Sequence, residues 1–490
     1  MPPRRFCPGS RPSTVSSSER PPHAPKPCDE ARYMTRSFST LAAALAIALT
    51  VGGMSGAAKA DTLRAALGDA YENSDLLEQS RFLARLQDEG VAQQISALRP
   101  IVNFIANSTW NSVTDTTVNS LTLVGELLVY DNGGRQRLVE AARESVLSAR
   151  QGLINLEQQV LLDAVTAYMN VWRDIQVVQV RESNVRVLTQ QLRAARDRFE
   201  VGEDTRTDVA QAEAQLAAAR SNLAAARGQL EISQELFVLA VGRPSEGLIG
   251  PGALPDLPDT EAEADRLARQ QHPLILGLQH EVRADELSLA AARTDYGPSV
   301  SLRAETGEAF GDRSNGVTNT LSLTLTQPIY RGGQLFSLER SAIATLNATE
   351  AELHQQVRLI VQSVGNAYAR LRIANAQIQA SDQQIRAAQL AFDGVREEAS
   401  LGARTTLDVL DAEQDLLDAR ISRIEAQADL YVGAYAALAS VGLLTVEHLN
   451  LDVPQYDPTA YSNAFGNAPT RSVSVRGQRL DGVLERIGRD

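Results

Sequence analysis

Cysteine and lysine are both rare in this chain, and both occur only in its first 60 positions. The cysteines are Cys7 and Cys28, and the lysines are Lys26 and Lys59. A chain that begins after position 60 therefore has no thiol, which excludes disulfides, thiolate metal sites and cysteine nucleophiles. It also offers no N-terminal cysteine for a lipid anchor.

Positive charge is also in short supply. Residues 1–60 hold 8 of the 47 basic residues and 3 of the 60 acidic ones, which leaves 39 against 57 and a formal charge of −18. Every base that remains is arginine. Binding to a nucleic acid depends on a basic surface that displaces counterions from the phosphates. We therefore expect no nucleic-acid partner.

Residue clusters that carry enzyme chemistry are missing as well. The five histidines lie far apart in the sequence, at His23, His272, His280, His354 and His448. They do not have the spacing of metal ligands, and the sequence has neither a phosphate-binding loop nor a nucleophile elbow. The sequence thus predicts no metal, no cofactor and no enzymatic activity.

The N-terminal part of the chain contains a predicted export signal. Residues 1–33 are rich in Pro, Ser and Arg, and we interpret them as a mis-assigned upstream segment; a disordered N-terminal arm is the alternative. From Met34 a short basic start leads to an 11-residue apolar run and then to Ala58-Lys59-Ala60. This order predicts a signal peptide over residues 34–60 that is cleaved near Ala60. The apolar run is too short for a retained transmembrane helix.

Two stretches that lie 200 residues apart carry the same pattern. The shared residues include Gly202, Thr205, Asp208 and Glu213 in the first stretch, and Gly402, Thr405, Asp408 and Glu413 in the second. Between Gly202 and Arg220, the offset preserves nine of nineteen positions. Such a period indicates duplication of a large unit. We assign the first repeat to residues 61–250 and the second to residues 251–451.

Each repeat contains a predicted long helical hairpin. The hairpins cover residues 134–241 and 333–441, and they turn at Gly202 and Gly402. Apolar residues recur there at helical spacing, and the first helix of the first hairpin is predicted to have about 65 residues and a length of roughly 100 Å. The threonine three positions after each glycine is a candidate helix cap. A shorter helical pair is predicted for residues 260–294. A soluble spectrin-like bundle would also have such helices.

Four predicted strands distinguish this chain from a helical bundle. They cover residues 100–113, 117–130, 298–310 and 317–330. Two of them alternate with period 2, with apolar residues at Leu121, Leu123, Leu127 and Val129, and at Val317, Leu321, Leu323, Leu325 and Ile329. Strands of this length with one apolar face resemble those of outer-membrane barrels. The alternative is a soluble four-stranded sheet packed on helices.

Four strands are too few to close a barrel. Open sheet edges are not tolerated in hydrocarbon, so other copies of the chain would have to complete it, two copies giving eight strands and three giving twelve. After the second repeat, residues 452–490 are predicted to form a disordered tail with a short helix at 480–487.

The residues at several junctions resemble those of the TolC-like outer-membrane efflux and type I secretion channels. The resemblance covers residues 62–451. It is most specific at the strand-to-helix junction 327–333, which contains Pro328, Tyr330, Gly332 and Gly333, and at the segment 401–412 around the second turn. The family implies a mostly α-helical fold with a transmembrane β portion. Three copies would form a 12-stranded barrel in the outer membrane and a helical tunnel through the periplasm. Implied partners are an inner-membrane transporter of ABC or RND type, a periplasmic adaptor protein and outer-membrane lipid.

The second hairpin carries an acidic stripe near its turn. Asp408, Asp411, Asp415 and Asp418 are spaced by 3, 4 and 3 positions, which places them on one face of a helix. Such a stripe is most often a solvated surface. Threefold symmetry would instead make rings of carboxylates at a pore constriction, and such rings select cations. The resemblance places the constricting aspartates at Asp408 and Asp411, and we add Asp415.

The resemblance also implies a latch at the hairpin tips, formed by Arg404 and Asp208. The family's tip tyrosine, which belongs to the same closed arrangement, is replaced here by Ala399. We therefore predict a passive exit duct for small molecules or secreted proteins, opened by its transporter and adaptor. The alternative is a periplasmic coiled-coil adaptor or scaffold, a class that shares long helical hairpins but lacks paired amphipathic strands.

Overall fold

A computed structural model describes residues 61–203, 205–311 and 316–465 of the chain. The segment 1–33, the predicted signal peptide 34–60 and the short helix expected at 480–487 lie outside the described residues. Within them, every helix is too short or too polar to cross a membrane.

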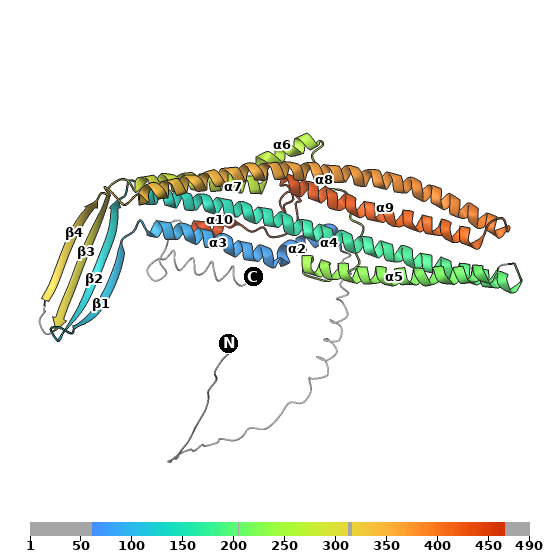
Figure 1. Cartoon of the computed structure of the whole chain (residues 1–490), viewed down its shortest axis with the longest axis horizontal. Coiled ribbons are helices and arrows are strands. Elements are labelled where there is room, and N and C mark those ends of the chain that lie inside the picture. The colour runs from blue at the N-terminus through green and yellow to red at the C-terminus, as the bar shows by residue number, and fades with distance from the viewer. Residues whose placement is uncertain (1–60, 204, 312–315, 466–490) are drawn as a thin grey trace, which may run out of the picture. The chain divides into compact units, whose positions relative to one another are not determined.

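The fold consists of two copies of one series of elements (Figure 1). The first copy contains α2 (Leu63–Asn73), α3 (Asp75–Ser96), β1 (Ile101–Asn111), β2 (Thr116–Tyr130), α4 (Gly134–Glu200) and α5 (Arg206–Val241). The second contains α6 (Glu261–Gln271), α7 (Pro273–Thr294), β3 (Ser299–Gly311), β4 (Gly316–Thr326), α8 (Gln334–Ser400) and α9 (Thr406–Val441). The long helices α4 and α8 both have 67 residues, and their partners α5 and α9 both have 36. These elements confirm the mostly helical fold with four strands.

The short helical pair of the second copy was predicted from the sequence, whereas the pair of the first copy was not. Helices α2 and α3 have the same lengths as α6 and α7, 11 and 22 residues. Thr62 and Ser74 cap α2 and α3, because their side chains accept hydrogen bonds from the N–H groups of Ala65 and Leu77. The 200-residue offset was the signal that would have revealed this pair.

The four strands form one antiparallel sheet in the order β1-β2-β3-β4. Pairing of β2 with β3 joins the two copies. In this sheet β1 and β4 each pair along one side only.

The register of the sheet collects apolar side chains on one face. Residues opposite each other in register point to the same side of a sheet. Phe104 lies opposite Leu123, and Leu302 lies opposite both Leu127 and Leu323. Phe104, Leu123 and Leu323 are 68, 45 and 69% exposed, so this apolar face is uncovered in the single chain. The structure thus confirms a shared face for the predicted apolar positions that lie in regular strand, whereas Val129 lies where the register of β2 with β3 shifts.

The last strand is shorter than the sequence predicted. β4 ends at Thr326 rather than near residue 330, because Pro328 has no N–H group for the ladder. Ile329 is therefore outside the strand and is 90% exposed. In the loop that follows, Gly332 and Gly333 have left-handed φ angles of +58° and +84°, a conformation that favours glycine. This requirement explains the two glycines of the predicted junction, where Tyr330 is exposed.

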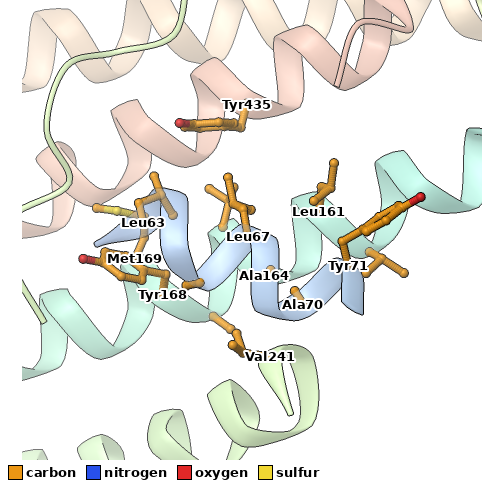
Figure 2. Packing of buried hydrophobic residues seen from close by; sticks show 14 of the residues in the cluster. Leu63, Leu67, Ala70, Tyr71, Leu161, Ala164, Tyr168, Met169, Val241 and Tyr435 are labelled. Carbon is orange, nitrogen blue, oxygen red and sulfur yellow. The ribbon is translucent and has the colours of Figure 1, made fainter. Parts of the chain in front are cut away.

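The largest apolar core lies where the short helix α2 crosses the long helices (Figure 2). Leu67 of α2 packs among side chains of α4, α5 and α9, among them Tyr168, Val241 and Tyr435. Tyr168 is fully buried, and its hydroxyl oxygen lies 2.9 and 2.6 Å from the carbonyl oxygens of Asp61 and Ile249, which share its single proton. Burial raises the pKa of the Tyr168 hydroxyl to about 12. The core therefore fixes the start of the first copy against both hairpins.

A partly buried ion cluster holds the beginning of the described chain to the linker between the two copies. The Arg243 guanidinium donates to both carboxylate oxygens of Asp61 at 2.8 Å and to Asp69 at 2.8 Å. Asp61 is 4% exposed and also accepts a 2.8 Å hydrogen bond from the Glu246 N–H. Burial by itself raises the pKa of Asp61, but the hydrogen bonds from Arg243 and Glu246 lower it below its usual value.

The expected disordered tail is wrong for its first part. Residues 458–465 form helix α10 (Pro458–Phe465), which packs on α3. The Tyr461 ring is buried, and its hydroxyl donates to Glu89 at 3.1 Å. The Arg81 guanidinium lies 5.2 Å from the ring centres of both Tyr71 and Tyr456. Aromatic side chains stacked on arginines therefore order a segment whose Pro and polar content suggested disorder.

Candidate functional site

The tips of the two long hairpins have the same local structure. Gly202 and Gly402 adopt left-handed φ angles of +82° and +77° at the turns. Thr205 and Thr405 then cap α5 and α9, as the sequence predicted.

Each cap is a complete capping box in which an aspartate takes part. Thr405 donates from its N–H and its hydroxyl to the Asp408 carboxylate at 2.9 and 2.8 Å, and its hydroxyl accepts from the Asp408 N–H at 3.2 Å. Thr205 and Asp208 repeat this arrangement at 2.9, 2.7 and 3.3 Å. The T-x-x-D spacing of both copies was the signal for it.

The same hydrogen bonds keep both aspartates ionised. The N–H and hydroxyl of Thr405 lower the pKa of Asp408, and the hydroxyl and N–H of Thr205 lower the pKa of Asp208. A negative charge in the first turn is also favoured by the helix dipole. The predicted constriction residue Asp408 therefore has a structural role at its own helix end, which its counterpart Asp208 shares.

The other acidic residues of the predicted stripe are free of the cap. Asp411, Asp415 and Asp418 are all exposed on α9. Asp418 accepts hydrogen bonds from Gln414 at 2.9 and 3.0 Å, four positions earlier on the helix. The structure thus presents Asp411 and Asp415 to solvent on one side of α9, while Asp408 is directed to Thr405.

The predicted latch residues have other partners within a single chain. The Arg404 guanidinium lies 2.9 Å from a carboxylate oxygen of Glu398, across the turn of its own hairpin. Asp208 is held by Thr205. Among the described residues of one chain, Arg404 and Asp208 do not form an ion pair. Glu398 lies six positions before Arg404 in the sequence and was not predicted as its partner. Ala399 borders a small apolar cluster that includes Phe392 and Val409.

The side of α9 opposite the acidic stripe packs against the first hairpin. Leu410 is 3% exposed and joins an apolar cluster with Leu188 and Leu192 of α4 and Leu216 of α5. One turn later, Glu413 is buried and accepts a 3.1 Å hydrogen bond from the Asn184 amide of α4. Sequence reasoning noted Glu413 only as a repeated residue.

Burial changes the acidity of this carboxyl. It raises the pKa of Glu413 to about 7, although the hydrogen bond from Asn184 and the charge of Arg420 act in the opposite direction. In the first copy, Glu213 is exposed and pairs with Arg196 at 2.5 Å. The two copies therefore use the same residue type in different environments.

The described residues of the tips form no recognisable metal centre. Across the described ranges, no group of three or more His, Cys, Asp or Glu side chains is arranged to hold a metal ion. Asp411 and Asp415 are four positions apart on one helix, so within one chain they supply two carboxylates.

Comparison with known proteins gives consistent matches over nearly the whole described chain. The sequence profile of the family described as outer membrane efflux protein matches residues 66–243 and 266–441. The outer membrane efflux protein BepC of Brucella suis is 35% identical over 83% of this chain and 91% of its own length. The alkaline protease secretion protein AprF of Pseudomonas aeruginosa is 24% identical over 77% of this chain and 84% of its own length.

A solved structure gives the same fold. The crystal structure of the Campylobacter jejuni CmeC outer membrane channel superposes with a TM-score of 0.70 at 14% identity, and it covers 84% of this chain and 90% of its own. At that identity the match concerns the fold alone.

Proposed function

This chain belongs to the outer membrane efflux protein family, and from that premise we propose that three copies form a passive exit duct across the outer membrane and the periplasm. Its sheets would build the part in the membrane, and its helical hairpins would build a tunnel below it. The duct would carry small molecules, secreted proteins or both.

The observation that carries this proposal is the state of the four-stranded sheet. One face is apolar and uncovered, and the outer edges of β1 and β4 are unpaired. In hydrocarbon the apolar face would be covered by lipid, but unpaired backbone groups at two edges would each cost several kcal/mol. Pairing of β1 with β4 of a neighbouring copy removes both edges. Three copies of a four-stranded sheet would then give twelve strands.

Uncovered apolar side chains on the helices support association of copies as well. On α3, Leu76, Phe82 and Leu86 are 57, 48 and 60% exposed. On α8, Phe336 and Leu390 are 62 and 76% exposed. Large apolar side chains left this exposed on several helices are typical of surfaces that other chains cover. We therefore assign these helices to contacts between copies.

Location and partners follow from the family and the relatives. We propose insertion in the outer membrane after cleavage near Ala60, which would leave the buried Asp61 close to the new N-terminus. We also propose that an inner-membrane transporter and a periplasmic adaptor recruit the duct. The relatives named for efflux and for protease secretion support both kinds of cargo.

At the hairpin tips we propose a cation-selective constriction and a latch. Threefold symmetry would repeat the exposed Asp411 and Asp415 as rings of carboxylates, with Asp408 contributing charge from its cap. Because Arg404 and Asp208 have other partners within one chain, their pairing would join neighbouring copies. A single exposed ion pair contributes about 0 to 1 kcal/mol, so a partner protein could break it.

Conductance measurements on the protein in planar bilayers test this proposal. We expect small conductance, because the proposed latch would hold the tips together, and block by trivalent cations from the tip side. The variant Asp411→Asn with Asp415→Asn should raise the blocking concentration at least ~10-fold, the equivalent of about 1.4 kcal/mol. Adding Asp408→Asn removes the third charge while an amide oxygen remains to accept from Thr405.

The matched control is Asp197→Asn, which removes an exposed carboxylate near the tip of the first hairpin. Block should not change in this variant. Unchanged block in the Asp411 and Asp415 variant would remove the constriction from the proposal. Recovery of the chain in the soluble periplasmic fraction, with no channels in bilayers, would favour an adaptor or scaffold.

A further inference from the structure

A small cavity lies between the two hairpins, close to the predicted constriction. It has a volume of about 100 Å³ and is lined by residues of α4, α8 and α9, including Asn184, Gln389, Glu413 and Arg420. Asn184 and Glu413 are 229 positions apart in the sequence, and their 3.1 Å hydrogen bond joins the first hairpin to the second. A change in the hydrogen bond between Asn184 and Glu413 therefore affects the contact between the two hairpins.

The second carboxylate oxygen of Glu413 is buried and has no hydrogen-bond partner. An ionised carboxylate would place negative charge on an oxygen that is shielded from solvent and has no donor, which is costly. A protonated carboxyl carries no charge, and its other oxygen still accepts from Asn184. The packed arrangement of the hairpins thus favours the protonated form.

The groups that face Glu413 do little to offset the preference for a protonated carboxyl. On α4, Ser183 and Asn184 line the cavity, and on α8, Gln389 and Phe392 do so, all of them neutral. The charged group that lines it is Arg420, on α9 itself. Its guanidinium donates to the Gln389 side-chain oxygen at 2.8 Å. The charge of Arg420 acts on the carboxyl of Glu413, but the hydrogen bond of its guanidinium goes to Gln389.

Glu413 lies next to the apolar contact between α9 and the first hairpin, so its protonation can affect that contact. Leu410 lies three positions earlier and is buried between α4 and α5 with Leu188 and Leu216. A movement that carries α9 away from α4 would expose Leu410 and Glu413 together. Water would then stabilise the ionised carboxylate, whereas the packed arrangement does not.

We propose that Glu413 is a proton-sensitive tether, which holds the second hairpin to the first while its carboxyl is protonated and weakens that contact when it ionises. The link to opening of a duct rests on the proposed function. The tether itself lies within one chain.

The direction of the pH effect follows from the two environments of the carboxyl. In the packed arrangement the pKa of Glu413 is about 7, and its ordinary value is 4.5. The contribution of the tether is fully present below the ordinary pKa and is lost as the pH rises towards 7. Each unit of difference in pKa changes the ratio of separated to packed hairpins tenfold, so the change is at most about 300-fold.

Distance measurements between spin labels test the tether in the intact protein. The chain has no cysteine beyond position 28, so Glu203→Cys and Ala403→Cys place one label on each exposed tip. Both original cysteines lie before the predicted cleavage site, so the mature chain adds no background label. Labelled chains are diluted with an excess of unlabelled chains, so that the measured distance lies within one chain.

We expect the tips to separate as the pH rises from about 5.5 to about 8.5, a range in which exposed carboxylates stay ionised. Glu413→Gln mimics the protonated form and should keep the short distance at both pH values. Glu425→Gln, which removes an exposed carboxylate of the same helix, should behave as the parent protein does. A parent distance that ignores pH, or a pH response that survives in Glu413→Gln, would overturn the tether.

Conductance of the same variants separates this proposal from the proposed function. Conductance should rise with pH in the parent protein and in Glu425→Gln, and stay low in Glu413→Gln. Channels with pH-independent tip distances would refute the tether and leave the duct standing. A pH-dependent distance in a protein that forms no channels would support the tether and refute the duct.

Discussion

Two acidic residues from equivalent positions, Glu213 and Glu413, show how a duplicated sequence acquires different roles in its two copies. Glu213 is exposed and pairs with Arg196, whereas Glu413 is buried against Asn184. The sequence around them preserves nine of nineteen positions at the 200-residue offset. Their difference arises from contacts with α4, which lies more than 200 positions before Glu413 and packs directly against α9.

The partly buried ion cluster at the linker gives a prediction about stability. Arg243→Gln would leave Asp61 and Asp69 without their shared countercharge. Breaking a buried pair costs about 3 to 5 kcal/mol, but the Arg243 side chain is 31% exposed, so we expect a loss of ~2 to 3 kcal/mol in the free energy of unfolding. A lowered melting temperature of the detergent-solubilised protein would show it.

The matched control is Arg269→Gln. Arg269 pairs with Asp265 on the surface of α6, and its side chain is 48% exposed. Loss of such an exposed pair should cost about 0.5 kcal/mol or less. If both variants melt at the same temperature, the cluster at Arg243 does not anchor the linker.

Helix α10 shows how an element can form through packing alone. Its eight residues are too few for a stable isolated helix, and their docking on α3 depends on aromatic contacts. Tyr461→Ala should cost about 3 kcal/mol of local stability, because it removes a buried ring, whereas Tyr461→Phe removes one hydrogen bond to Glu89 and should cost about 1 kcal/mol.

Hydrogen exchange of the α3 backbone amides measures this difference. Because local opening exposes the amides, their exchange should accelerate about 100-fold in Tyr461→Ala and less than about 10-fold in Tyr461→Phe. Equal exchange in both variants would mean that α10 does not stabilise α3.

Local sequence signals predicted the elements that depend on local chemistry. Uninterrupted helical periodicity predicted α4 and α8, the glycines at the turns predicted the hairpins, and alternation predicted the apolar face of the sheet. Pro328 ended β4 earlier than alternation suggested, because a missing N–H group outweighs an apolar pattern. Helix α10 was missed because its stabilising partners, Arg81 and Arg85, lie about 375 positions earlier in the sequence.

At the candidate site, the sequence predicted the features that depend on local spacing, but not those that depend on contacts between distant segments. The spacing from Thr405 to Asp408 already contains the capping box, and the spacing of Asp411 and Asp415 already gives the exposed stripe. The pairing of Arg404 with Glu398 requires the geometry of the turn. The burial of Glu413 requires knowledge of which helix covers it, and no local pattern supplies that.

At the scale of the whole molecule, the four-stranded sheet is the feature that distinguishes a proposed duct from a soluble helical protein. A single copy leaves one apolar face uncovered and the edges of β1 and β4 unpaired. If neighbouring copies pair these edges, one continuous barrel results, and the hairpins of the same copies lie around one axis. The constriction and the latch both depend on that arrangement.

Disulfide cross-linking in the outer membrane tests this arrangement, because the predicted mature chain has no cysteine of its own. Asn103→Cys in β1 is combined in turn with Thr320→Cys, Ser322→Cys and Thr324→Cys in β4, all on the face opposite the apolar one. The control combines Ser301→Cys with Thr324→Cys, which are opposite each other within one chain and should close without a change in mass. We expect at least one β1–β4 combination to link copies, with three chains as the largest product. Failure of every combination to link copies, or a ladder that continues beyond three chains, would contradict a closed trimeric barrel.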